Sequence, residues 1–257
     1  MNPSIDRELE LALRLADAAD AITVPRYRSS GLQVDEKPDH TPVTEADRAA
    51  ERALRSLLAA ARPDHGVLGE EFGISGTDTE WQWVIDPIDG TMNYVRGIPV
   101  WATLIALAHR GRPVVGVVSA PLLHRRWWGG LGIGAFGDGE RINVSAVSAL
   151  ENAQLSFNAL RDFEEHGGHA AMTSLLAKVW RVRGFGDFWS HMLVAEGAAD
   201  VAVEATVKPW DMAAVQIVVE EAGGRFSDLG GAPDFGGGSA LSTNGLLHDK
   251  VLSFFAS

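Results

Sequence analysis

The sequence feature that most constrains the fold is an apolar stretch that runs directly into two carboxylates. Residues 81–85 are mostly apolar, as in a short buried strand, and Asp86-Pro87-Ile88-Asp89-Gly90 follows at once. The proline and glycine of this segment are typical of a rigid turn, so we expect the strand to end at residue 85. Residues 67–69 predict a second short strand, which ends in Glu70 and Glu71. A chain with this pattern gathers acidic side chains at the ends of strands.

The surrounding sequence predicts a mixed α/β protein made of two fused sub-domains. Apolar residues at helical spacing indicate a helix from Ile5 to just before Pro25, and a second helix begins at Thr44, with Asp47 in capping-box spacing. Later segments predict an antiparallel meander and then alternating strands and helices: strands 101–108, 114–120, 125–128, 155–158, 180–183 and 200–204, and helices 170–179, 188–197 and 210–222. Because no linker interrupts the chain, we expect intimately packed sub-domains of residues 1–143 and 144–257.

Composition limits the partners and the chemistry. The 257-residue chain carries 34 acidic and 22 basic side chains, a net charge of −12, which argues against nucleic acid or an anionic membrane as a partner. Cysteine is absent, which excludes disulfides, thiolate catalysis and cysteine-based metal sites. The N-terminus lacks the features of a signal peptide, and no apolar run reaches the roughly 18 residues of a membrane helix. We expect a cytoplasmic protein.

Clustered carboxylates repel one another, so a bound cation is one explanation of the acidic strand ends. Oxygen ligands without histidine or cysteine favour magnesium, manganese or calcium. Each acid also has a structural explanation: Asp-Pro and Asp-Gly are common in turns, Asp47 fits a helix cap, and Asp211 stands at an expected helix start. The structural explanation is adequate for each acid alone. A metal site is favoured by the whole set: Glu70, Glu71, Asp86, Asp89 and Asp211.

Three segments together resemble the inositol monophosphatase family of magnesium-dependent phosphatases. They are Gly69-Glu70-Glu71, residues 83–94 (Trp-Val-Ile-Asp-Pro-Ile-Asp-Gly-Thr-Met-Asn-Tyr) and Trp210-Asp211-Met212-Ala213-Ala214. Their order and separation agree with the family, and the similarity extends over about residues 5–255. The resemblance implies a layered αβαβα fold, a site between the two halves and a homodimer.

The same resemblance implies roles for individual residues. Glu70, Asp86, the carbonyl of Ile88, Asp89 and Asp211 would bind two or three Mg²⁺ ions, with Mn²⁺ able to replace them. The backbone of Gly90 and Thr91 would bind the phosphate, with Asp89 and Asp211 also touching the substrate. Thr91, Asp47 and Glu70 would orient and deprotonate the attacking water, while Glu71 lies outside the ligand set. A dianionic phosphomonoester approaching so acidic a chain needs such cations, which fits direct hydrolysis without a phosphoenzyme.

Within the family, the sequence is most similar to the histidinol-phosphate phosphatases of actinobacterial type. Residues 96–101, 119–121, 125–128 and 181–188 carry this similarity. Histidinol has an ammonium group and an imidazole, so Asp187 could pair with a cation, and Glu204 is the expected second acid. Arg183 is a weaker substrate-side candidate. A helix cap is the structural alternative for Asp187, and Met92 stands where we expect a polar or basic residue.

Three other functions stay open at this level. Inositol 1-phosphate or a related sugar phosphate is the alternative substrate. A metal-binding regulatory module without turnover is opposed by the complete acidic set. A nicotinamide oxidoreductase rests only on the glycine pattern of residues 132–137, which is followed by turn residues and therefore predicts a hairpin. The segment His166-Gly167-Gly168-His169 predicts a mobile loop that covers the site.

Overall fold

The computed structural model describes residues 4–38, 41–76 and 80–256. Its helices are α1 (Ile5–Arg26), α2 (Glu45–Ala61), α3 (Thr91–Arg96), α4 (Leu160–Glu165), α5 (His169–Leu176), α6 (Asp187–Ala195), α7 (Pro209–Glu221) and α8 (His248–Phe255), with short 3₁₀ turns at Pro121–Leu123 and Leu150–Asn152. Its strands are β1 (Val34–Glu36), β2 (Pro42–Thr44), β3 (Gly66–Gly69), β4 (Gly73–Ser75), β5 (Trp81–Asp89), β6 (Ala102–His109), β7 (Arg112–Ala120), β8 (Arg125–Gly130), β9 (Gly134–Gly137), β10 (Glu140–Arg141), β11 (Gln154–Phe157), β12 (Arg181–Arg183), β13 (Val201–Glu204), β14 (Arg225–Ser227) and β15 (Ala240–Thr243).

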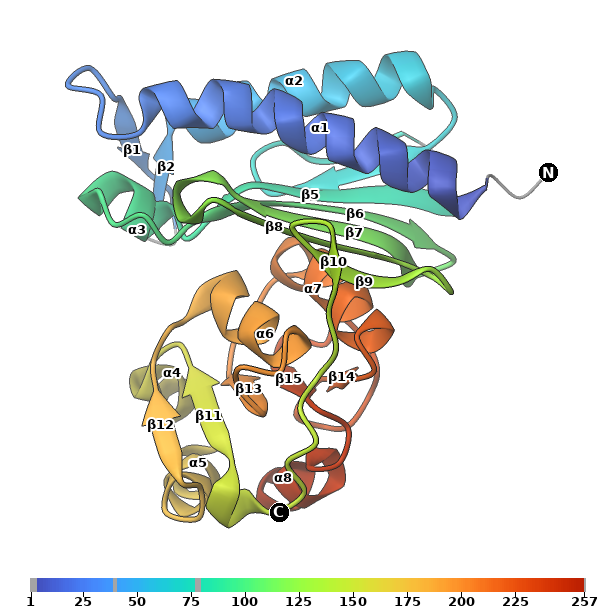
Figure 1. Cartoon of the computed structure of the whole chain (residues 1–257). Coiled ribbons are helices and arrows are strands. Elements are labelled where there is room, and N and C mark those ends of the chain that lie inside the picture. Colours follow the sequence, from blue (N-terminus) through green and yellow to red (C-terminus); the bar gives the residue numbers. More distant parts are fainter. Residues whose placement is uncertain (1–3, 39–40, 77–79, 257) are drawn as a thin grey trace.

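These elements form five layers, as the resemblance implies (Figure 1). Helices α1 and α2 cover one face of a large sheet, and α6 and α7 lie between its other face and a smaller sheet. Helices α4, α5 and α8 cover the far face of the smaller sheet. None of the helices in the described part of the chain is both long and apolar enough to cross a bilayer.

The large sheet contains the predicted meander. Its strand order is β10-β9-β8-β7-β6-β5-β3-β4, and all its pairings are antiparallel except that of β3 with β5. The glycine-rich residues 132–137 belong to the β9–β10 hairpin, as predicted, and not to a nucleotide-binding turn. The smaller sheet has the order β12-β11-β13-β15-β14, in which β12, β11 and β13 are parallel.

Helices on both faces explain why the central strands are almost continuously apolar. Successive side chains of a strand point to opposite faces, so Leu104 on β6 packs toward α7 while Ile105 packs toward α1. On β7, Val117 and Val118 divide in the same way. The large sheet is therefore packed against helices on both apolar faces, and the acidic side chains of β5 lie at the end of that strand.

Two prolines do not end the elements that they are predicted to end. Strand β5 does not end at residue 85 but continues through Pro87 to Asp89. Its register against β6 shifts between Asp86 and Asp89, and Pro87, which lacks an N–H, lies in that irregular stretch. Helix α1 likewise includes Pro25 and ends one residue later, at Arg26. In both places the tertiary structure accepts a proline that the local pattern treats as a stop.

Helix α7 approaches the large sheet closely at Gly116 on β7. A Cβ atom there would lie 2.4 Å from Cγ2 of Ile217 and 2.6 Å from the carbonyl oxygen of Ala214, both on α7. Since α7 also carries Asp211, this contact sets how near that acid lies to the end of β5.

We predict that Gly116→Ala destabilises the protein by about 1–3 kcal/mol, because the helix backbone must move to admit the methyl group. Urea unfolding followed by circular dichroism measures this change. Gly31→Ala is the control, since a Cβ atom at Gly31 meets nothing within 4 Å. Equal midpoints for the two variants would contradict the close contact.

Candidate active site

A cavity of about 570 Å³ lies at the end of β5, beside the first residues of α3, α6 and α7. Because β3 and β5 pair in parallel, with Gly69 opposite Ile85, the acidic residues that follow β3 and those that end β5 lie at the same end of the two strands. The N-terminal ends of α3, α6 and α7 meet them there. The cavity is lined by Lys37, Thr41, Pro42, Glu70, Asp86, Ile88, Asp89, Gly90, Thr91, Met92, Asp187, Lys208, Trp210 and Asp211.

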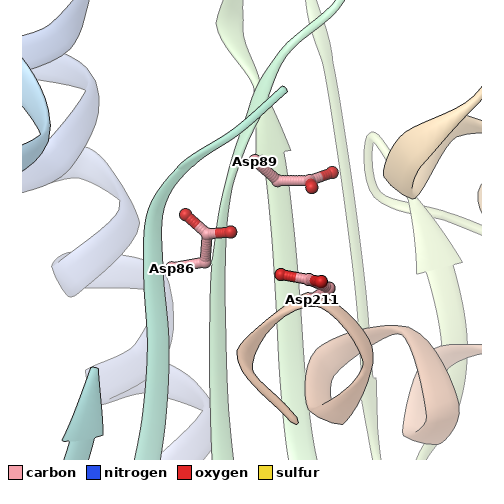
Figure 2. Close-up of side chains that lie close together, drawn as sticks. All are labelled: Asp86, Asp89 and Asp211. Atoms are coloured by element: carbon pink, nitrogen blue, oxygen red, sulfur yellow. The ribbon is translucent and has the colours of Figure 1, made fainter. Parts of the chain in front are cut away.

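Three of the predicted acids converge within this cavity (Figure 2). Asp86 and Asp89 extend from β5, and Asp211 faces them from the first turn of α7, in the other half of the chain. One carboxylate oxygen from each of the three lies within 4.8 Å of the others. Residues distant in sequence thus form one cluster of carboxylate oxygens.

The electrostatics of the cluster are unfavourable without a cation. Burial, then the charges of Glu70 and Asp89, raises the pKa of Asp86 well above its usual value. Burial and the charge of Asp187 do the same for the pKa of Asp89. Burial raises the pKa of Asp211 to about 8, although a hydrogen bond from the Lys208 backbone opposes the shift. A divalent cation would remove this penalty, and an all-oxygen donor set fits magnesium or manganese.

Glu70 reaches the cavity from the turn after β3, beside Glu71. Nζ of Lys37 lies 2.7 Å from Oε1 of Glu70 and 2.7 Å from Oε1 of Glu71. Burial raises the pKa of Glu71 to about 7, even though the ammonium group of Lys37 opposes the shift. Lys37 is not among the residues predicted for the site, because it stands in a short polar stretch without a motif and joins the acids only through the fold.

Asp47 and Thr91 form a second polar pair at the edge of the cavity. Asp47 closes the predicted capping box of α2, where Oδ2 accepts the backbone N–H of Thr44 at 2.8 Å. Its Oδ1 lies 3.3 Å from the Thr91 hydroxyl, which is 2.8 Å from the carbonyl of Ile88. Burial raises the pKa of Asp47 to about 6. The helix-cap explanation is therefore correct, and it places the other oxygen toward Thr91.

Asp187 lies in the cavity in a backbone conformation unusual for a residue other than glycine. It begins α6 with φ of +48°, and its Oδ2 accepts a hydrogen bond of 3.3 Å from Asn93 Nδ2. Asp187 does not cap α6: the N-cap position is Gly186, and no side chain accepts a cap hydrogen bond there. The backbone N–H of Phe188 donates to Oδ2 of Asp89 at 2.8 Å. Burial, then the charge of Glu204, raises the pKa of Asp187 to about 7. The alternative of a helix cap is wrong here.

The remaining predicted residues lie outside the lining of the cavity. Glu204 is buried at the end of β13, with Oε1 3.3 Å from Nε2 of His191, and it acts on Asp187 and Asp211 through its charge. Arg183 is exposed on the edge strand β12 and donates to the carbonyl of Val182. Residues 166–169 run from the end of α4 into the start of α5 and do not line the cavity.

Comparisons with known proteins agree with this geometry. The model of the inositol monophosphatase family matches residues 5–253. The chain is 55% identical over 251 residues to a histidinol-phosphatase of Mycobacterium tuberculosis and 51% identical over 256 residues to one of Streptomyces coelicolor, with 96% of each chain covered in both cases. An inositol monophosphatase structure from Zymomonas mobilis superposes with a TM-score of 0.88 at 34% identity and covers 100% of both chains. Over essentially its whole length, then, this chain belongs to the inositol monophosphatase family.

Proposed function

We propose that this chain is a metal-dependent histidinol-phosphatase, which hydrolyses L-histidinol phosphate to L-histidinol and phosphate. The observation that carries the proposal is the cluster of buried Asp86 and Asp89 with half-buried Asp211, whose oxygens converge within 4.8 Å. The full-length identity of 51–55% to two histidinol-phosphatases supports this substrate over inositol 1-phosphate.

The proposed metal ligands are Glu70, Asp86, the carbonyl of Ile88, Asp89 and Asp211, and we propose that they hold two or three Mg²⁺ ions. Bound ions would neutralise the acids, bind the phosphate oxygens and lower the pKa of a bound water. Mn²⁺ has the same preference for oxygen ligands and should replace Mg²⁺.

The phosphate would be received at the start of α3. Gly90 has φ of +82°, and a Cβ there would lie 3.1 Å from the carbonyl of Val100, so this turn needs glycine. The first-turn N–H groups of a helix have no partner within it and suit an anion. Thr91 and Asp47 would orient the attacking water. With a pKa of about 6, Asp47 is mostly ionised at neutral pH and could accept its proton.

On the substrate side, Asp187 would pair with the ammonium or imidazole of histidinol. Glu204, which does not line the cavity, would add negative charge near Asp187. Arg183 stays a prediction without a contact to the cavity. A cytoplasmic homodimer likewise stays a prediction from the sequence.

We expect Asp89→Asn to lower kcat by more than about 100-fold, because the variant loses a negatively charged ligand at the reacting centre. The fold should survive, since asparagine can still accept the Phe188 N–H. Phosphate release from histidinol phosphate with saturating Mg²⁺ measures the effect, and Asp249→Asn on the exposed face of α8 is the control. Unchanged turnover in Asp89→Asn would refute the proposed site.

We expect Asp187→Asn to reduce kcat/KM for histidinol phosphate by about 10-fold or more, mainly through KM, since a charge-assisted contact to a cation is lost. Hydrolysis of inositol 1-phosphate should change little. Asparagine tolerates the left-handed backbone. Asp138→Asn is the matched control, because Asp138 also has positive φ but does not line the cavity. Equal losses on both substrates would argue against a specific cation contact.

We expect the metal-free protein to lose stability as the pH rises from about 6 to 9. The folded pKa values of Asp187 (about 7) and Asp211 (about 8) exceed their unfolded values, so the folded state binds more protons and weakens as they leave. Thermal unfolding in EDTA should show Tm falling through this range. Mg²⁺ should raise Tm most at the alkaline end, unlike a potassium salt of equal ionic strength. A flat Tm in EDTA would contradict the repulsion.

A further inference from the structure

We infer that Glu51 is a positioning residue for the metal site: its buried carboxylate fixes the turn that carries Glu70 and thereby sets the affinity for Mg²⁺. This inference rests on the proposed function, in which Glu70 is a metal ligand. Glu51 itself does not line the cavity.

The Glu51 carboxylate contacts the turn between β3 and β4 and an arginine on its own helix. Glu51 lies on α2 and is completely buried. Its Oε2 accepts the backbone N–H of Glu71 at 2.7 Å, and its Oε1 accepts the N–H of Phe72 at 3.2 Å and Nε–H of Arg55 at 2.8 Å. The two backbone groups belong to the residues that directly follow Glu70. An ionised acceptor makes such bonds shorter and stronger than a neutral one does.

The ion pair of Glu51 and Arg55 also holds the β4 side of the turn, through Arg55. Arg55, one helical turn after Glu51, donates to the carbonyl of Gly73 and to the Ser75 hydroxyl at 2.6 Å on β4. A Cβ atom at Gly69 would lie only 2.1 Å from Oε1 of Glu51. The carboxylate therefore packs directly against the residue that precedes Glu70, and the Glu51–Arg55 pair holds the turn at both ends.

Helix α2 links this turn to the water-orienting pair. Asp47 lies four residues before Glu51, one turn earlier on the same helix, and reaches Thr91. The charge of Glu70 contributes to the raised pKa of Asp47. Helix α2 therefore carries both Asp47 and the carboxylate that accepts the N–H groups next to Glu70. The Glu70 N–H itself donates to the carbonyl of Ile85 on β5 at 3.3 Å, so the turn is held from the sheet and from α2.

The test is Glu51→Gln, followed by calorimetric titration with Mg²⁺. The single amide oxygen of glutamine cannot accept hydrogen bonds from all three donors, which are the N–H groups of Glu71 and Phe72 and the Nε–H of Arg55. The NH₂ group of the glutamine would face one of these donors, so the turn should loosen. We expect Mg²⁺ affinity to fall about 10–100-fold, the range typical when a group that supports a metal ligand is lost. At fixed sub-saturating Mg²⁺, kcat should fall while KM for histidinol phosphate changes little, and excess Mg²⁺ should restore part of the activity.

Glu8→Gln is the matched control. Glu8 on α1 is also a buried glutamate paired with an arginine, with Oε1 2.7 Å from Nη2 of Arg62 at the opposite end of α2, and neither residue lines the cavity. This variant should lower Tm and leave Mg²⁺ affinity unchanged. If Glu51→Gln also lowers Tm but binds Mg²⁺ within twofold of the wild type, the positioning role is refuted.

Gly69→Ala provides a second route that retains the charge of Glu51. The new methyl group would push the carboxylate away from the turn, so Mg²⁺ affinity should fall in this variant too, even if Glu51→Gln does not fold. Normal Mg²⁺ affinity in a folded Gly69→Ala protein would overturn the inference. A wild-type protein that binds Mg²⁺ but does not hydrolyse histidinol phosphate would refute the proposed substrate alone, and one that binds no Mg²⁺ would refute both proposals.

Discussion

The main physical constraint on this structure is the repulsion among carboxylates that lie close together, two of them buried and the third half-buried. Asp86 and Asp89 at the end of β5 and Asp211 at the start of α7 have raised pKa values chiefly because they are withdrawn from water, and secondarily because each senses neighbouring acids. Such an arrangement costs stability and persists only where the surrounding scaffold is rigid. The five layers provide that rigidity: the large sheet is packed on both faces, and α7 approaches β7 so closely that only glycine fits at residue 116.

Each of these acids also accepts a hydrogen bond from a backbone N–H. Asp86 accepts the N–H of Ile88 at 2.9 Å, Asp89 that of Phe188 at 2.8 Å, and Asp211 that of Lys208 at 2.7 Å. A carboxylate has two oxygens, so one can hold a turn or helix end while the other is offered to the cavity. The bond from Phe188 to Asp89 also joins the two halves of the chain across the site. The hydrogen bonds that these residues accept are therefore compatible with their proposed role as metal ligands.

The sequence predicted the acids at the strand ends, the capping of α2, the meander and the hairpin at residues 132–137, because these depend on local patterns. Local patterns failed where tertiary contacts decide. Strand β5 passes through Pro87 because the register shift removes the need for its N–H, and Lys37 joins the acids from a segment without a motif. The placement of Glu204 behind Asp187 depends on how α6 packs over β13, which no short segment encodes.

The central claim is that the buried acids exist to bind divalent cations. Anomalous diffraction from crystals grown with Mn²⁺ tests it most directly, because the signal locates the ion independently of any activity. If the three acids bind the ion, we expect an anomalous peak about 2.0–2.6 Å from oxygens of Asp86, Asp89 and Asp211. Peaks confined to surface acids such as Asp249, with none in the cavity, would contradict it.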